Sequence, residues 1–125
     1  MTLPARRLSD TELEVMQAVW ACPAPASRAD INRLLHEAHP MAQTTLLTLL
    51  SRLSEKGFIR IKKEGRSARY YPLVDRQEYL ANQSGQMIRR LFGGNMSAFA
   101  SALCDSGLTG EEIEELRELL ERNQL

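Results

Sequence analysis

The side chains best suited to specific chemistry fall into two groups within residues 43–69 of this 125-residue chain. The first group is polar and uncharged and falls within two turns of a predicted helix: Gln43, Thr44, Thr45 and Thr48. A glutamine amide can pair with the major-groove edge of adenine, and a threonine can hydrogen-bond a base or touch a thymine methyl group. We therefore expect these four residues to read bases in double-stranded DNA.

The second group is basic and follows the first along the chain: Arg52, Lys62, Lys63, Arg66 and Arg69. Cationic side chains bind phosphate oxygens, which fixes the register of a protein on DNA without reading its sequence. Although the formal net charge is zero, residues 52–76 carry eight Lys/Arg against three Asp/Glu, and residues 77–125 carry four against eight. This local excess of positive charge predicts contact with a polyanion, with the acidic end of the chain kept away from it.

Three helices must position the first group. A capping box at residues 9–12 begins a helix over 10–21, and a second helix begins after Ser27 and ends before Pro40. The third helix runs from Gln43 to Lys56, and Gly57 ends it. Its core-facing stripe has the i, i+3, i+4, i+7 spacing: Leu46, Leu49, Leu50 and Leu53. Thr44 and Thr48 then lie on the opposite face, Thr45 and Arg52 on one flank and Leu47 on the other.

After Gly57 the apolar residues alternate with polar ones, which is typical of strands. Residues 58–63 and 67–73 predict a β-hairpin, with a short turn at Glu64-Gly65-Arg66. Three helices followed by a hairpin predict a mainly α chain with a small β-hairpin, in which residues 1–75 form a winged helix-turn-helix DNA-binding domain.

Residues 76–125 predict three short amphipathic helices without a large core of their own. Burial against a second copy around a two-fold axis is the simplest way to cover their apolar stripes, and packing onto the first domain of the same chain is the alternative. We expect a helical dimerisation region in which these residues are buried: Met87, Leu91, Phe92, Phe99, Leu103, Ile113, Leu116 and Leu120. A homodimer would read a palindromic site.

Several motifs, matching in order and spacing, make the chain resemble the penicillinase repressor (BlaI/MecI/CopY) family of bacterial transcriptional repressors. They are residues 8–16 with Trp20, residues 45–53 leading into 56–59, Arg69-Tyr70-Tyr71-Pro72, residues 91–96 and residues 111–116. The resemblance implies a homodimer on dyad operators, with residues 76–125 as the dimerisation part. It also implies repression of genes for β-lactam resistance, copper handling or related envelope stress.

Two departures limit what this resemblance implies about induction. In the antibiotic branch a membrane sensor protease cleaves the repressor between an Asn and a Phe, and the corresponding stretch is Ala102-Leu103. The copper branch ends in Cys-x-Cys motifs, which the sequence lacks. Ala42 stands where a capping Ser or Asp is expected and Leu47 where relatives often carry a basic residue, so we expect greater reliance on the wing.

Other functions are less well supported by the residues. A winged-helix adaptor that docks an acidic protein partner remains an alternative, as does a redox- or ligand-sensing regulator acting through Cys104. We expect Cys104 to be buried with Phe99 and Leu103 and Cys22 to be more exposed in its loop. His36 and His39 lack further ligands for a zinc site. No catalytic motif, cofactor motif or membrane-spanning run is present, which predicts a cytoplasmic protein that is not an enzyme.

Overall fold

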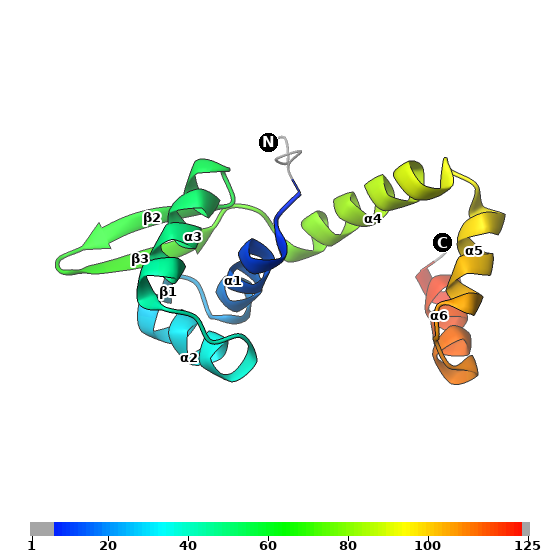
Figure 1. The fold of residues 1–125 in the computed structure, drawn as a ribbon, viewed down its shortest axis with the longest axis horizontal. Coiled ribbons are helices and arrows are strands. Elements are labelled where there is room, and N and C mark those ends of the chain that lie inside the picture. Colours follow the sequence, from blue (N-terminus) through cyan, green and yellow to red (C-terminus); the bar gives the residue numbers. More distant parts are fainter. Residues whose placement is uncertain (1–6, 124–125) are drawn as a thin grey trace. The chain divides into compact units, whose positions relative to one another are not determined.

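The computed structural model describes residues 7–123 and divides the chain into two compact units (Figure 1). The first unit ends at Ala81 and the second begins at Asn82. The first unit extends beyond the boundary expected at residue 75 because Tyr79, in the next helix, is buried in its core. The ring of Tyr79 lies 5.6 Å from that of Phe58 and 5.7 Å from that of Trp20, between centroids.

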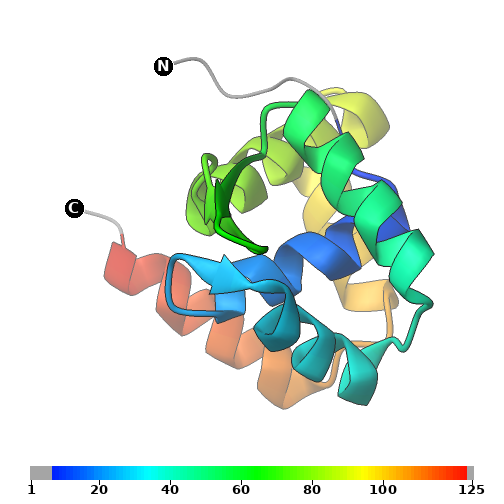
Figure 2. The same cartoon turned by 90° about the vertical axis from the view of Figure 1, so that its left-hand side faces the viewer.

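The three predicted helices of the first unit are confirmed as α1 (Asp10–Ala21), α2 (Arg28–Ala38) and α3 (Gln43–Glu55). Capping boxes begin the first two, because the side chains of Ser9 and Ser27 each accept a hydrogen bond from the backbone N–H three residues later. Ala42 gives α3 no such bond. Figure 2 shows α1 beside α2 and α3, and it packs against both.

The predicted hairpin is confirmed as β2 (Ile59–Glu64) and β3 (Ser67–Pro72), which pair antiparallel. Gly65 takes a positive φ of 64° in the connecting turn, a conformation that suits glycine. A third strand, β1 (Ala26–Ser27), pairs with β3, so the sheet has the order β1-β3-β2. Sequence reasoning missed β1 because two residues are too few to show an alternating pattern.

The core of the first unit lies between the helices and the sheet. Its largest fully buried side chains include Phe58, Met16 and Ile31, and the four leucines predicted for the inner face of α3 are all buried. The indole N–H of Trp20 donates to the Val74 carbonyl at 2.9 Å, which fixes the chain after β3 against α1. The core thus holds α3 in one rotational position.

One buried ion pair joins α1 to the end of α3. The Glu12 side chain is 3% exposed, and its Oε1 accepts hydrogen bonds from Lys56 Nζ at 2.6 Å and from the Ser9 N–H at 2.9 Å. Burial by itself would raise the pKa of the Glu12 carboxyl, but Lys56 and Ser9 stabilise the carboxylate and lower that pKa overall. Sequence analysis identified Glu12 only as part of a capping box.

The second unit contains most of α4 (Arg76–Phe92), with α5 (Met96–Asp105) and α6 (Gly110–Asn123). The rings of Phe92 and Phe99 meet edge to face, 5.4 Å between centroids. Within the described part of the chain, no residue from 80 to 123 is buried. The helices are therefore formed without a closed core.

The two cysteines differ from expectation. Cys104, expected to be buried, is exposed, because α5 lacks a covering layer within the described unit. Cys22, expected to be the more exposed, is buried with the core residues at the end of α1. Burial raises the pKa of the Cys22 thiol, and the nearby Asp30 carboxylate raises it further.

The ion pair predicts how stability depends on pH. Because the pKa of Glu12 is lower in the folded chain, its stabilisation is complete above the ordinary value of 4.5 and is lost as pH falls through the folded value. Glu12→Gln should lower the free energy of unfolding at pH 7 by about 2 kcal/mol, the typical value of a hydrogen bond to a charged group. Urea unfolding from pH 7 to pH 3 measures this, and the loss caused by the substitution should shrink with acidification.

Glu55→Gln makes the same chemical change at an exposed position next to Lys56 and serves as the control. It should change stability by less than about 0.5 kcal/mol. Equal stability of the Glu12→Gln variant and wild type at pH 7 would contradict a stabilising role for the pair.

Candidate nucleic-acid interface

The outer face of α3 carries the residues predicted to read bases. Gln43, Thr44, Thr45 and Thr48 are all exposed, because burial of the leucine stripe turns the opposite side of the helix outward. The Thr48 hydroxyl donates to the Thr44 carbonyl at 2.9 Å. Because this bond uses the hydroxyl proton, the Thr48 oxygen is left to act as an acceptor. Its lone pairs can accept a hydrogen bond from a base amino group.

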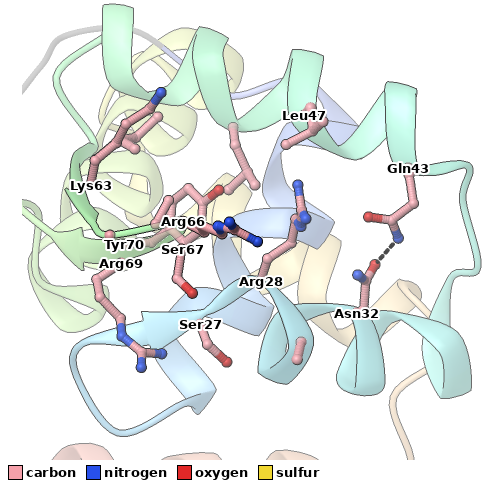
Figure 3. Close-up of a pocket in the computed structure, with 15 residues that line it drawn as sticks. Ser27, Arg28, Asn32, Gln43, Leu47, Lys63, Arg66, Ser67, Arg69 and Tyr70 are labelled. Carbon is pink, nitrogen blue, oxygen red and sulfur yellow. Dashed lines mark hydrogen bonds between the residues drawn. The ribbon is translucent and has the colours of Figure 1, made fainter.

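A groove of about 770 Å³ lies beside this face, between α2, α3 and the hairpin (Figure 3). Gln43, Leu47 and Leu50 line it from α3, at the i, i+4, i+7 spacing of one helix face. Leu47 is 42% exposed and Ile61, on the hairpin side, is 38% exposed. The groove therefore has an apolar floor with polar and basic side chains around it.

The register of the hairpin divides the residues predicted to bind phosphates between its two faces. Residues directly opposite each other on antiparallel strands point to the same side of the sheet. Lys63 is opposite Ala68 and lines the groove, together with Arg66 of the turn. Lys62 is opposite Arg69, so the register assigns both to the other face of the hairpin, although Arg69, unlike Lys62, also lines part of the groove. Arg69 Nε also lies 3.7 Å from Glu64 Oε2.

Not all of the predicted site residues meet at the groove. The helical spacing puts Thr45 and Arg52 on the flank of α3 away from Leu47, and both are exposed there. His36 lies in α2 and His39 follows its end. Among the described residues, no group of three or more His, Cys, Asp or Glu side chains could hold a metal ion.

Two groove residues from α2 were missed by sequence reasoning, Arg28 and Asn32. They lie four residues apart, on the helix face next to the one that buries Ile31 and Leu35. That spacing was visible in the sequence, but α2 was interpreted only as a supporting helix. Asn32 Oδ1 accepts a hydrogen bond from Gln43 Nε2 at 2.8 Å, and Arg28 adds a fourth cationic residue to Lys63, Arg66 and Arg69 among those that line the groove (Figure 3).

Three helices, an exposed polar face on the third, and a basic hairpin beside that face define a winged helix-turn-helix protein. In proteins of this class the second helix of the helix-turn-helix motif, which corresponds to α3, enters the major groove. Among residues 7–123, no helix combines the length and apolar composition needed to cross a membrane.

Comparison of the sequence with known proteins shows which family the chain belongs to. Residues 8–122 match the family model described as penicillinase repressor. The penicillinase repressor of Bacillus licheniformis is 31% identical over 119 residues, which cover 94% of this chain and 92% of that protein. The methicillin resistance regulatory protein MecI of Mammaliicoccus sciuri is 30% identical, over 92% of this chain and 94% of that protein. The chain therefore belongs to the penicillinase repressor family, as its motifs predicted.

Two solved structures share the fold. The solution structure of the DNA-binding domain of the repressor BlaI superposes with a TM-score of 0.53 at 32% identity, covering 63% of this chain and 94% of that one. The monomeric form of Bacillus licheniformis BlaI in complex with the blaP half-operator gives a TM-score of 0.50 at 32% identity, covering 60% and 90%. These matches confirm the predicted fold class.

Proposed function

We propose that this chain is a cytoplasmic, homodimeric, sequence-specific repressor that occupies a palindromic operator. The observation that carries the proposal is the juxtaposition of the outer face of α3 with a groove bordered by Arg28, Lys63 and Arg66. A helix can enter the major groove with its N-terminal residues against base edges while the cations bind phosphates. The BlaI structure with its half-operator supports this use of the fold.

In this proposal Gln43, Thr44, Thr45 and Thr48 read bases, and the basic residues of α3 and the hairpin bind phosphates. Lys63, Arg66 and Arg69 line the groove beside α3, and the register directs Lys63 to that side of the hairpin, so these residues are expected to act on the same DNA segment as α3. Leu47 replaces a charged contact with an apolar one, which suits a thymine methyl group. The operator sequence is therefore expected to differ from that of relatives with a basic residue there.

The second unit supports the dimer. The residues proposed to be buried between two copies include Leu91 and Leu120, which are each 59% exposed. The others are partly exposed: Met87, Phe92, Phe99, Leu103, Ile113 and Leu116. An identical helical unit can cover these side chains symmetrically, and a two-fold dimer matches a palindromic site.

We propose that release from DNA acts through residues 77–125, in a resistance or envelope-stress response. A membrane sensor protease encoded elsewhere is the candidate partner implied by the antibiotic branch of the family. Ala102-Leu103, which stand at the position of that branch's cleavage site, lie inside α5, so cleavage there would require local opening of a helix.

Selection of the purified full chain against a random pool of short duplexes, at near-physiological salt, tests the proposal. An inverted repeat is expected, with half-sites separated by about one helical turn or a multiple of it. Recovery of no motif, with binding that only fades as salt rises, would contradict sequence-specific repression and favour the adaptor alternative.

The hairpin register predicts different effects for adjacent lysines. Lys63→Ala should weaken binding to all duplexes and reduce the slope of log K against log salt by about one per protomer, because one phosphate contact is lost. Lys62→Ala removes the same charge from the other face of the hairpin and should reduce the slope less. Titrations of a fluorescent duplex at several salt concentrations measure both slopes, and equal slopes for wild type and Lys63→Ala would exclude Lys63 from the phosphate contacts.

Sedimentation velocity tests the dimer. Leu91→Ser or Leu120→Ser should raise the dimer dissociation constant about tenfold or more, since burying a leucine contributes about 1.5–3 kcal/mol. Glu118→Ser, at an exposed polar position of α6, is the matched control and should leave the dimer dissociation constant unchanged. A wild-type chain that sediments as a monomer both free and on the selected duplex would contradict the dimer.

A further inference from the structure

We propose that Asn32 of α2 is a positioning residue for Gln43, so that two paired amides, rather than Gln43 alone, determine the base read at the start of α3. The inference rests on the proposed function and deepens it. It concerns a residue on the helix that precedes the base-reading helix, outside the set that the sequence predicted to contact DNA.

The geometry begins with the hydrogen bond between the two helices. Gln43 Nε2 donates to Asn32 Oδ1 at 2.8 Å, and both side chains line the groove beside the hairpin (Figure 3). The pair is exposed, so this bond competes with water and contributes little to the free energy of unfolding. Its main physical effect is to restrict a long, flexible side chain to one region of the groove.

The bond also fixes the orientation of the Gln43 amide. A glutamine amide has two N–H donors on one side and a carbonyl acceptor on the other, and rotation by half a turn exchanges them. In the structure Asn32 turns its Oδ1, an acceptor, toward Gln43, so the nitrogen of Gln43 lies on the α2 side. Adenine presents a donor at N6 and an acceptor at N7, and a glutamine pairs with both when its carbonyl faces N6 and its second N–H faces N7. In this arrangement the pair presents donor and acceptor in the order that adenine requires.

The N-terminus of α3 gives a reason why Gln43 needs such support. Gln43 is the first residue of the helix, and Ala42 supplies no side-chain cap for the backbone N–H groups there. Helix ends without caps fray more easily. A tie to α2, which has its own capping box at Ser27, holds the first residue of α3 against the better-anchored helix.

The test is the base preference of variants, measured on the duplex pool and then on the selected duplex with single base changes. Gln43→Ala should reduce discrimination at one base pair of each half-site about tenfold, the scale of a lost bidentate contact. Asn32→Ala should reduce discrimination at that same pair several-fold and leave the other positions unchanged. The double variant should discriminate no worse than Gln43→Ala alone, because the two residues act as one unit.

Two further variants separate positioning from a structural role. Asn32→Asp keeps an oxygen that accepts from Gln43, so it should preserve the base preference even though its charge weakens binding to every duplex. Asn82→Ala breaks a similar amide pair in α4, where Gln86 Nε2 lies 2.9 Å from Asn82 Oδ1, and should not alter base preference.

An Asn32→Ala variant with unchanged base preference would overturn the inference while leaving the proposed repressor function intact, even if its thermal stability fell. Additive losses in the double variant would also overturn it. A wild-type chain that selects no motif at all would overturn the proposed function and this inference together.

Discussion

Burial of the leucine stripe of α3 is the constraint on which the rest of the first unit depends. Leu46, Leu49, Leu50 and Leu53 must all face the core, and only one rotation of the helix achieves this. That rotation turns Thr44 and Thr48 outward and aims Gln43 at α2. Two hydrogen bonds add to this packing. Asn32 accepts one from Gln43 at the start of α3, and Glu12 accepts one from Lys56 just after its end. The helix is thus fixed along its length by apolar packing and at its C-terminal end by the buried Glu12–Lys56 pair, while the exposed bond from Gln43 to Asn32 orients one side chain.

The sheet extends this control to the basic hairpin. β1 pairs with β3 and leads directly into α2 through Ser27, so the hairpin and α2 share a common anchor. Tyr70, opposite both Ala26 and Ile61, is buried and locks the register of all three strands. A shift by one residue would exchange the two faces of the hairpin and move Lys63 away from the groove. The position of the Lys63 side chain therefore depends on β1, although neither residue of β1 is predicted to contact DNA.

Most of this architecture could be predicted because its signals are local. Capping boxes, the leucine spacing and the change of period after Gly57 each involve residues within one turn or one strand. Three features that were missed depend on contacts between segments that are separate in the sequence: β1 with β3, Glu12 with Lys56, and Asn32 with Gln43. The exposure of Cys104 and the burial of Cys22 were misjudged for the same reason, because neither a helical stripe nor a position in a loop shows which distant segments cover a side chain. At the groove, the sequence indicated the face of α3 but not the contribution of α2.

The two units of the chain differ in how fully they bury their apolar side chains, and this difference bears on function. Among the described residues, the first unit buries eighteen apolar side chains, and none of its buried side-chain nitrogen or oxygen atoms lacks a hydrogen-bond partner. The second presents leucines, two methionines and aromatic rings on helices that bury none of them fully. Amphipathic helices of this length are marginal in water unless their apolar faces are covered. If a second copy covers them, the stability of the second unit is coupled to assembly, and any change that loosens those helices weakens the dimer before it affects the outer face of α3. A signal can then remove such a repressor from a two-part site without touching a residue that contacts DNA, since binding of two linked domains is far tighter than binding of one.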